Sequence, residues 1–74
     1  MEAILKYNLP DEQSEFDEAV NGGTFRYILW ELNQHLRSIV KYQSENFSED
    51  YVTACEETRE KIFELCRENS VNLD

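Results

Sequence analysis

The sequence predicts a mainly α-helical fold: an antiparallel helical hairpin, a short first helix, and a short N-terminal strand that pairs between subunits. Two stretches, 25–42 and 49–68, repeat apolar residues at spacings of three and four, as helices with one buried face do. The connection between them is short, which favours antiparallel neighbours. The 74 residues form one small domain, 1–74, whose limited core leads us to expect a dimer or larger homo-oligomer.

Residues 3–9 predict the strand, because they are mostly apolar and alternate between two faces. No second strand is predicted in the chain. The backbone groups of a lone strand need partners, so we expect this strand to pair with the same strand of another subunit. The alternative is an extended arm that lies on the helices.

A short first helix is predicted over 11–20. Pro10 precedes it, and Asp11, Glu12 and Glu15 lie in its first turns, where the helix dipole favours negative charge. The following residues, Asn21-Gly22-Gly23, predict its end, since glycine readily adopts the left-handed conformation that closes many helices.

The long second helix is predicted over 25–42, with Thr24 as its N-cap. One side of it is expected to pack in the core. That side carries Phe25, Ile28, Leu29, Leu32, Leu36, Ile39 and Val40.

The third helix is predicted over 49–68, with Ser48 as N-cap, Asn69 as C-cap and a short apolar tail over 70–74. One half of it is apolar and the other half is rich in glutamate. Cys55 and Cys66 lie about 16 Å apart along this helix, beyond the reach of a disulfide, so we expect buried reduced thiols.

The formal net charge of -9 argues against a protein that coats nucleic acid. Residues 24–43 nevertheless carry three basic residues against one acidic residue, so a mildly basic helix lies within an acidic chain. The sequence shows neither a signal peptide nor a transmembrane stretch, so we expect a cytoplasmic protein without membrane contact.

The predicted ligand site is a polar and aromatic stripe on the second helix. We expect Tyr27 and Gln34 to contribute to ligand binding beside it. Its residues recur at steps of four, three, four and four, and lie on one side of the helix. Arginine and lysine provide charged donors, an indole stacks on a base, and asparagine hydrogen-bonds a base edge. Two alternatives are a core edge flanked by solvated charges and a protein-binding hot spot. The stripe consists of Arg26, Trp30, Asn33, Arg37 and Lys41.

Glutamates on the third helix give two further hypotheses. Glu56, Glu57 and Glu60 resemble the first half of the magnesium site of MazG-like nucleotide pyrophosphatases, but the second half is missing. Rows of carboxylates also imitate nucleic-acid phosphates and so block basic clefts on other proteins. We expect no catalytic residue, metal site or cofactor.

The segments LPDEQSEFDEAVNG, ILWELNQHLRSIVKY and YVTACEETREKIFELCRENSVNLD, behind an opening strand, resemble small bacteriophage-encoded helical proteins of the counter-defence or host-takeover type. The resemblance implies a non-enzymatic protein that sequesters a small anionic, nucleotide-like signal such as a cyclic nucleotide. The alternative is an acidic inhibitor that binds a host or defence protein.

Overall fold

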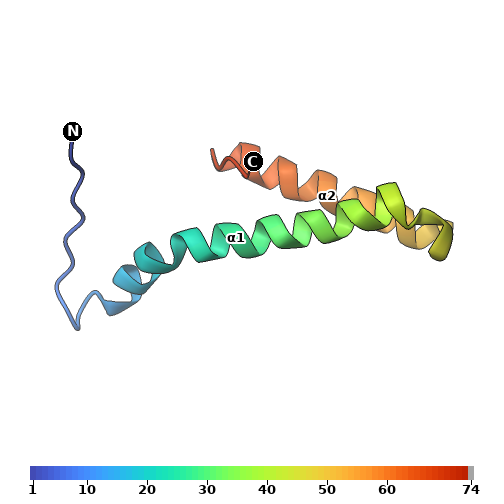
Figure 1. Ribbon diagram of the computed structural model, residues 1–74. Coiled ribbons are helices and arrows are strands. Elements are labelled where there is room, and N and C mark those ends of the chain that lie inside the picture. Colours follow the sequence, from blue (N-terminus) through green and yellow to red (C-terminus); the bar gives the residue numbers. More distant parts are fainter. Residues whose placement is uncertain (74) are drawn as a thin grey trace.

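Two antiparallel helices make up most of the protein (Figure 1). The structure, a computed structural model, describes residues 1–73, so Asp74 of the predicted tail lies outside the described residues. α1 spans Gln13–Tyr42 and α2 spans Glu49–Glu68, joined through the 3-10 turn η1, Ser44–Asn46. The predicted helical hairpin is confirmed, and α2 covers the residues predicted for the third helix. Neither helix is long and apolar enough to cross a membrane.

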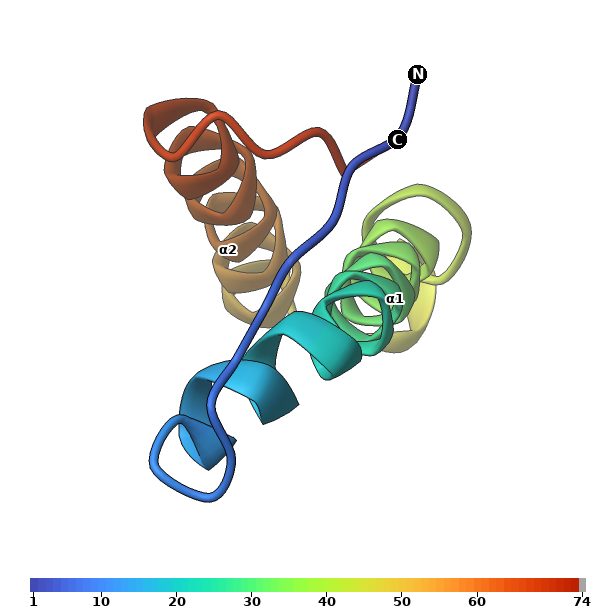
Figure 2. The same cartoon turned by 90° about the vertical axis from the view of Figure 1, so that its left-hand side faces the viewer.

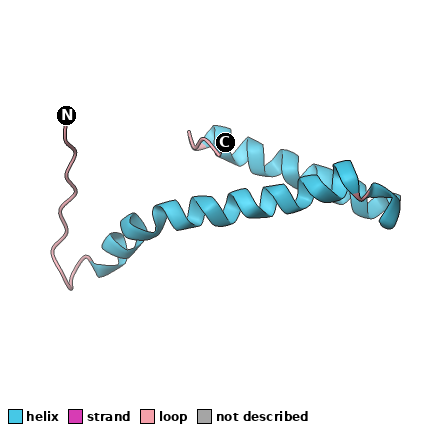
Figure 3. Cartoon of the chain, viewed as in Figure 1, coloured by secondary structure: helices cyan, strands magenta, loops and turns pink. Residues whose placement is uncertain are grey.

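The N-terminal strand is not present in the part of the chain that the structure describes (Figure 3). Residues 1–8 form an extended arm that leaves the far end of α1 (Figure 1). Tyr7 contacts Phe16 edge to face, with ring centroids 5.9 Å apart. An alternating sequence forms a strand only where another strand provides hydrogen bonds, and one copy of this chain offers none. Pairing between subunits stays a prediction.

The predicted helix end at Asn21-Gly22-Gly23 is wrong, because α1 continues through it and Thr24 lies inside the helix. Neither glycine has a positive φ, so neither terminates the helix. The helix continues across the pair, although Asn21 and Thr24 beside it are weak helix formers, at a cost of about 1 kcal/mol per glycine. The first turns of α1 lie off the axis of the rest (Figure 2), as is common near paired glycines.

The turn between the helices is fixed by local contacts. Ser48 caps α2 as predicted: its hydroxyl accepts a hydrogen bond from the backbone N–H of Tyr51 at 3.2 Å. The rings of Phe47 and Tyr51 stack over the same turn, with centroids 4.8 Å apart. These contacts define where the chain reverses and therefore which residues of α1 and α2 face each other.

The chain leaves α2 through Ser70, two residues after the helix ends. Ser70 has the left-handed conformation, with a φ of 56°. The backbone N–H of Val71 donates to the carbonyl of Cys66 at 2.8 Å, and that of Ser70 donates to the carbonyl of Arg67 at 3.2 Å. This pair of bonds is a Schellman motif. It turns the tail back onto the hairpin, where Leu73 is buried.

The core is small and lies between the helices. Its buried apolar residues are Ile39, Cys55, Ile62, Cys66 and Leu73. Both cysteines are free and buried, as predicted. The radius of gyration is 17.2 Å, whereas a compact domain of this length has about 11 Å. One copy is therefore elongated, and much of its apolar surface stays in contact with solvent.

Replacement of both glycines by alanine, Gly22→Ala with Gly23→Ala, should stabilise the protein. Both have helical backbone angles, and a Cβ at either position has nothing within 4 Å. Alanine should therefore raise the free energy of unfolding by about 0.5–1 kcal/mol per site. Urea unfolding followed by circular dichroism measures this. A loss of stability would show that the chain breaks here in a conformation that only glycine adopts.

The positive φ of Ser70 predicts a second substitution that stabilises the protein. Ser70→Gly should raise the free energy of unfolding by about 1 kcal/mol, because glycine adopts a positive φ without strain. The neighbouring Asn69→Gly, at a position with a φ of -104°, is the matched control and should not stabilise. Equal effects of the two variants in thermal unfolding would contradict the Schellman geometry.

Candidate functional site

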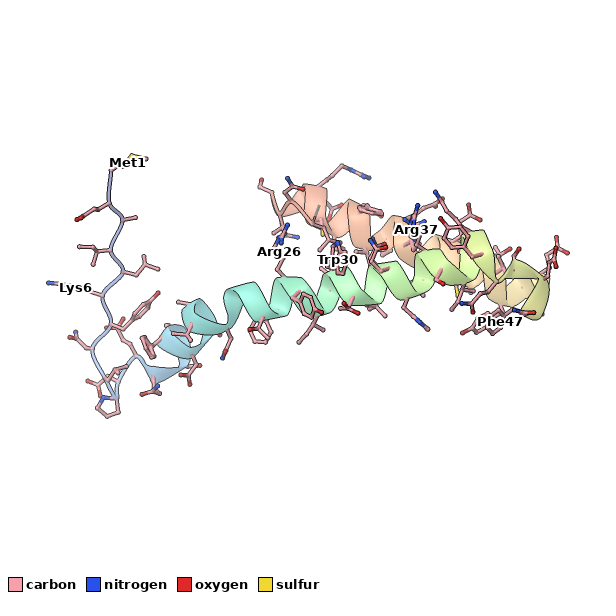
Figure 4. All side chains as sticks on the ribbon, viewed as in Figure 1. Met1, Lys6, Arg26, Trp30, Arg37 and Phe47 are labelled. Carbon is pink, nitrogen blue, oxygen red and sulfur yellow. The ribbon has the colours of Figure 1, made fainter. Side chains whose placement is uncertain are left out.

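The predicted stripe on α1 faces α2. Figure 4 shows Arg26, Trp30 and Arg37 pointing from α1 toward α2 and its C-terminal tail. Asn33, between them in the stripe, is only 2% exposed. Its side-chain carbonyl accepts a hydrogen bond from Nε of Arg59 at 3.1 Å. Asn33 of the predicted site therefore forms a polar contact that joins the two helices.

Arg26 joins α1 to the C-terminal tail. Its Nε donates to the carbonyl of Asn72 at 3.0 Å, and its Nη2 donates to the carbonyl of Leu73 at 3.2 Å. These carbonyls lie beyond the end of α2, so no backbone N–H of the helix bonds to them. The two bonds fix the guanidinium in one place and leave three of its five N–H groups for other acceptors.

A hollow of about 340 Å³ lies beside this contact. Its lining residues are Arg26, Tyr27, Trp30 and Leu73, and we call it the aromatic hollow. The Tyr27 and Trp30 rings stack with centroids 6.2 Å apart and planes inclined by 22°. Tyr27 is 59% exposed, so one ring of the pair presents a free face to solvent.

A carboxylate raises the pKa of the tyrosine in this hollow. The hydrogen bond to Glu31, followed by the negative charge of Glu31, raises the pKa of the Tyr27 phenol above its ordinary value of 10.0. Because the folded value is the higher one, this interaction contributes to stability below pH 10 and is lost as the pH rises through the folded pKa. At neutral pH the phenol is uncharged and does not repel an anion.

The remaining predicted residues lie outside the aromatic hollow. Arg37 is eleven residues from Arg26, about 16 Å along the helix axis. Its guanidinium lies 5.7 Å from the centroid of the Tyr42 ring. Lys41 is exposed one turn further on, and Gln34 is half-buried. Three of the seven predicted residues therefore share one hollow, and ligand binding by the whole stripe stays a prediction.

The sequence analysis missed two residues of this region, Leu73 in the hollow and Arg59 opposite Asn33. One signal was available for the second. On α2, Val52, Cys55, Arg59, Ile62 and Cys66 recur at steps of three and four, the same repeat that the stripe on α1 follows. Matching repeats of this kind are typical of two helices that pack along a seam.

The glutamate cluster that resembles half of a magnesium site remains on the surface of α2. Glu56, Glu57 and Glu60 are all exposed. Among the described residues, no group of three or more histidine, cysteine, aspartate or glutamate side chains is arranged to hold a metal ion.

The fold and the aromatic hollow define a small α-helical hairpin protein with a ring-lined surface site. No protein-family model, curated protein or solved structure matches the chain.

Removal of the amide opposite Arg59 should destabilise the hairpin. Asn33→Ala leaves a half-buried guanidinium without its acceptor, so the free energy of unfolding should fall by about 1–3 kcal/mol. The double variant Asn33→Leu with Arg59→Met replaces both partners by apolar groups and should recover most of this loss. Chemical denaturation of the variants measures these effects.

The matched control is His35→Ala, two residues further along α1 at an exposed position. Its effect should stay within about 0.5 kcal/mol, as for most surface substitutions. If Asn33→Ala were equally mild, the hydrogen bond would contribute nothing to the hairpin.

Proposed function

We propose that the protein is a non-enzymatic binding protein that captures a small anionic, nucleotide-like ligand in the aromatic hollow. One observation supports the proposal most strongly: Arg26, Tyr27 and Trp30, all expected from the sequence to bind ligand, line one hollow. A planar base stacks on the exposed face of Tyr27, beside Trp30.

The anionic part of the ligand would bind to Arg26. Its guanidinium is already held by the carbonyls of Asn72 and Leu73, so little side-chain entropy is lost when it donates its free N–H groups to a phosphate. The volume of about 340 Å³ falls at the lower end of small-molecule sites. The hollow therefore suits one nucleotide unit, with the rest of a larger ligand in solvent or on a second subunit.

The resemblance to small bacteriophage proteins extends this proposal to a biological role. A protein that binds a cyclic nucleotide without transforming it lowers the free concentration of that signal. In a host that uses such a signal for defence, sequestration would act as counter-defence in the cytoplasm.

A second function rests on a different observation, the unpaired carboxylates of α2. Within residues 1–73, Lys61 and Glu64 form the one ion pair, at 3.4 Å. The other acidic residues of the outer face are free to meet a basic partner; they are Asp50, Glu56, Glu57, Glu60 and Glu68. We propose, as the alternative, an acidic inhibitor that binds a basic cleft of a host or defence protein.

A thermal-shift screen tests the first function, with cyclic di-adenylate, cyclic di-guanylate, a cyclic trinucleotide and ADP-ribose as probes. A probe at one hundred times its dissociation constant adds about 2.7 kcal/mol, a shift of several degrees for a chain of this size. Tyr27→Ala should abolish the shift because the base loses its stacking surface. Arg26→Lys should weaken it because lysine cannot hold both carbonyls and the ligand.

Two controls separate the two functions. Arg37→Ala lies outside the aromatic hollow and should keep the full shift, whereas a loss would restore the longer stripe as the site. Charge reversal by Glu57→Lys with Glu60→Lys should also keep it. If no probe binds and this reversal instead abolishes binding to a basic protein, the acidic-inhibitor function replaces ligand capture.

A further inference from the structure

One side of the hairpin exposes large apolar side chains that the sequence had assigned to the core. Their exposed fractions lie between 45% for Leu65 and 58% for Ile28. We call this surface the apolar face. It consists of Phe25, Ile28 and Leu32 on α1, Tyr51 and Leu65 on α2, and Val71 in the tail.

Most of these residues lie in the half of the hairpin near the tail, whereas Tyr51 lies about 21 Å along α2 from Leu65. Phe25, Ile28 and Leu32 follow each other at steps of three and four on one stripe of α1. An open groove of about 250 Å³ begins at Leu29, next to that stripe in sequence, and reaches α2. The groove is lined by Leu29, Ile62, Leu65, Cys66, Asn69 and Val71, so it joins α1, α2 and the tail.

The contact between α1 and α2, which we call the seam, explains why the exposed apolar face needs a partner. In most two-helix contacts the apolar residues fill the seam and the polar residues point outward. Here the seam contains the Asn33–Arg59 hydrogen bond and the Arg26 contacts to the tail. The apolar residues of α1 at 25, 28 and 32 lie outside it. The seam also buries Ile39, Cys55, Ile62, Cys66 and Leu73, so a further gain from apolar burial becomes available when another surface covers the apolar face.

The size of the face matches a protein interface. Six large side chains, each about half exposed, present roughly 500 Å² of apolar surface, near the upper end of the largest patch on a typical monomer. Two such faces in contact would bury roughly 1,000 Å², the lower limit of a specific protein interface.

The charges favour a second copy as the partner. Two chains of net charge -9 repel each other unless their carboxylates stay apart. By their helical spacing, Glu56, Glu60 and Glu64 lie about 100° or more around α2 from both Tyr51 and Leu65, whereas Glu57 and Glu68 lie at the edge of the face. A contact through the apolar face therefore keeps most of both acidic surfaces in solvent.

We propose that the apolar face is the contact between two copies of this chain, which together form a four-helix bundle. A two-fold contact needs a surface that complements itself, and an apolar face with a central groove provides one. The chain's own arm is a poor occupant, because residues 1–8 lie apart from α2 at the far end of α1 (Figure 1). The inference is independent of ligand capture, because the aromatic hollow has other lining residues.

Light scattering of the full chain tests the proposal. The wild type should have the mass of a dimer, and its unfolding midpoint should rise with protein concentration, since unfolding releases two chains. Ile28→Glu with Leu32→Glu should raise the dimer dissociation constant by roughly a hundredfold or more, giving monomers under the same conditions.

Matched controls place substitutions of the same kind elsewhere. Ile4→Glu with Val20→Glu changes two aliphatic residues that are 78% and 62% exposed but lie outside the apolar face, and the mass should remain that of a dimer. Leu5→Pro blocks strand pairing and should also leave the dimer intact. If the glutamate pair on the apolar face prevents folding, the milder Leu32→Ala should still weaken the dimer about tenfold.

Three results would overturn the proposal: a wild type that is monomeric with a concentration-independent midpoint, a dimer that persists in the Ile28→Glu, Leu32→Glu variant, or a dimer lost in either control variant. Tyr27→Ala separates the two proposals, because it should lose ligand binding and keep the dimer.

Discussion

The hydrogen bond from Arg59 to Asn33 joins the two helices between the turn and the tail. Asn33 is buried and Arg59 is half-buried, so a shift of one helix along the other would leave the amide without its partner. In the observed alignment the Ser48 cap and the Phe47–Tyr51 stack close the turn at one end. At the other end the tail meets Arg26.

The contact between Arg26 and the tail gives one residue two roles. Its guanidinium satisfies carbonyls beyond the end of α2 and at the same time forms one wall of the aromatic hollow. The buried Leu73 side chain forms another wall. The site therefore exists only while the tail is docked, so ligand binding and the order of the last residues should stabilise each other.

Much of the fold could be predicted from sequence because its signals are local. Ser48 is followed by a strongly two-sided stretch, and α2 begins and ends where that pattern does. The failures depend on context. Gly22 and Gly23 take helical backbone angles inside α1, although glycine often ends a helix, and an alternating arm forms a strand only if another strand is available.

The site was harder to predict because helical periodicity does not say which face meets which neighbour. Phe25, Ile28 and Leu32 have the spacing of a core row, and Asn33 lies on a row that resembles a solvated site. The structure assigns them the other way round, with Asn33 buried and the apolar row exposed. Only the position of Arg59 on the partner helix distinguishes these arrangements.

Isotope-filtered nuclear Overhauser spectroscopy on a mixture of labelled and unlabelled chains separates contacts within one copy from contacts between copies. The methyl groups of Ile28 and Leu32 should show contacts to the apolar face of the other chain. Contacts of Trp30 with α2 should arise only within one copy. Intermolecular contacts confined to residues 1–9, or none at all, would contradict an apolar contact between copies.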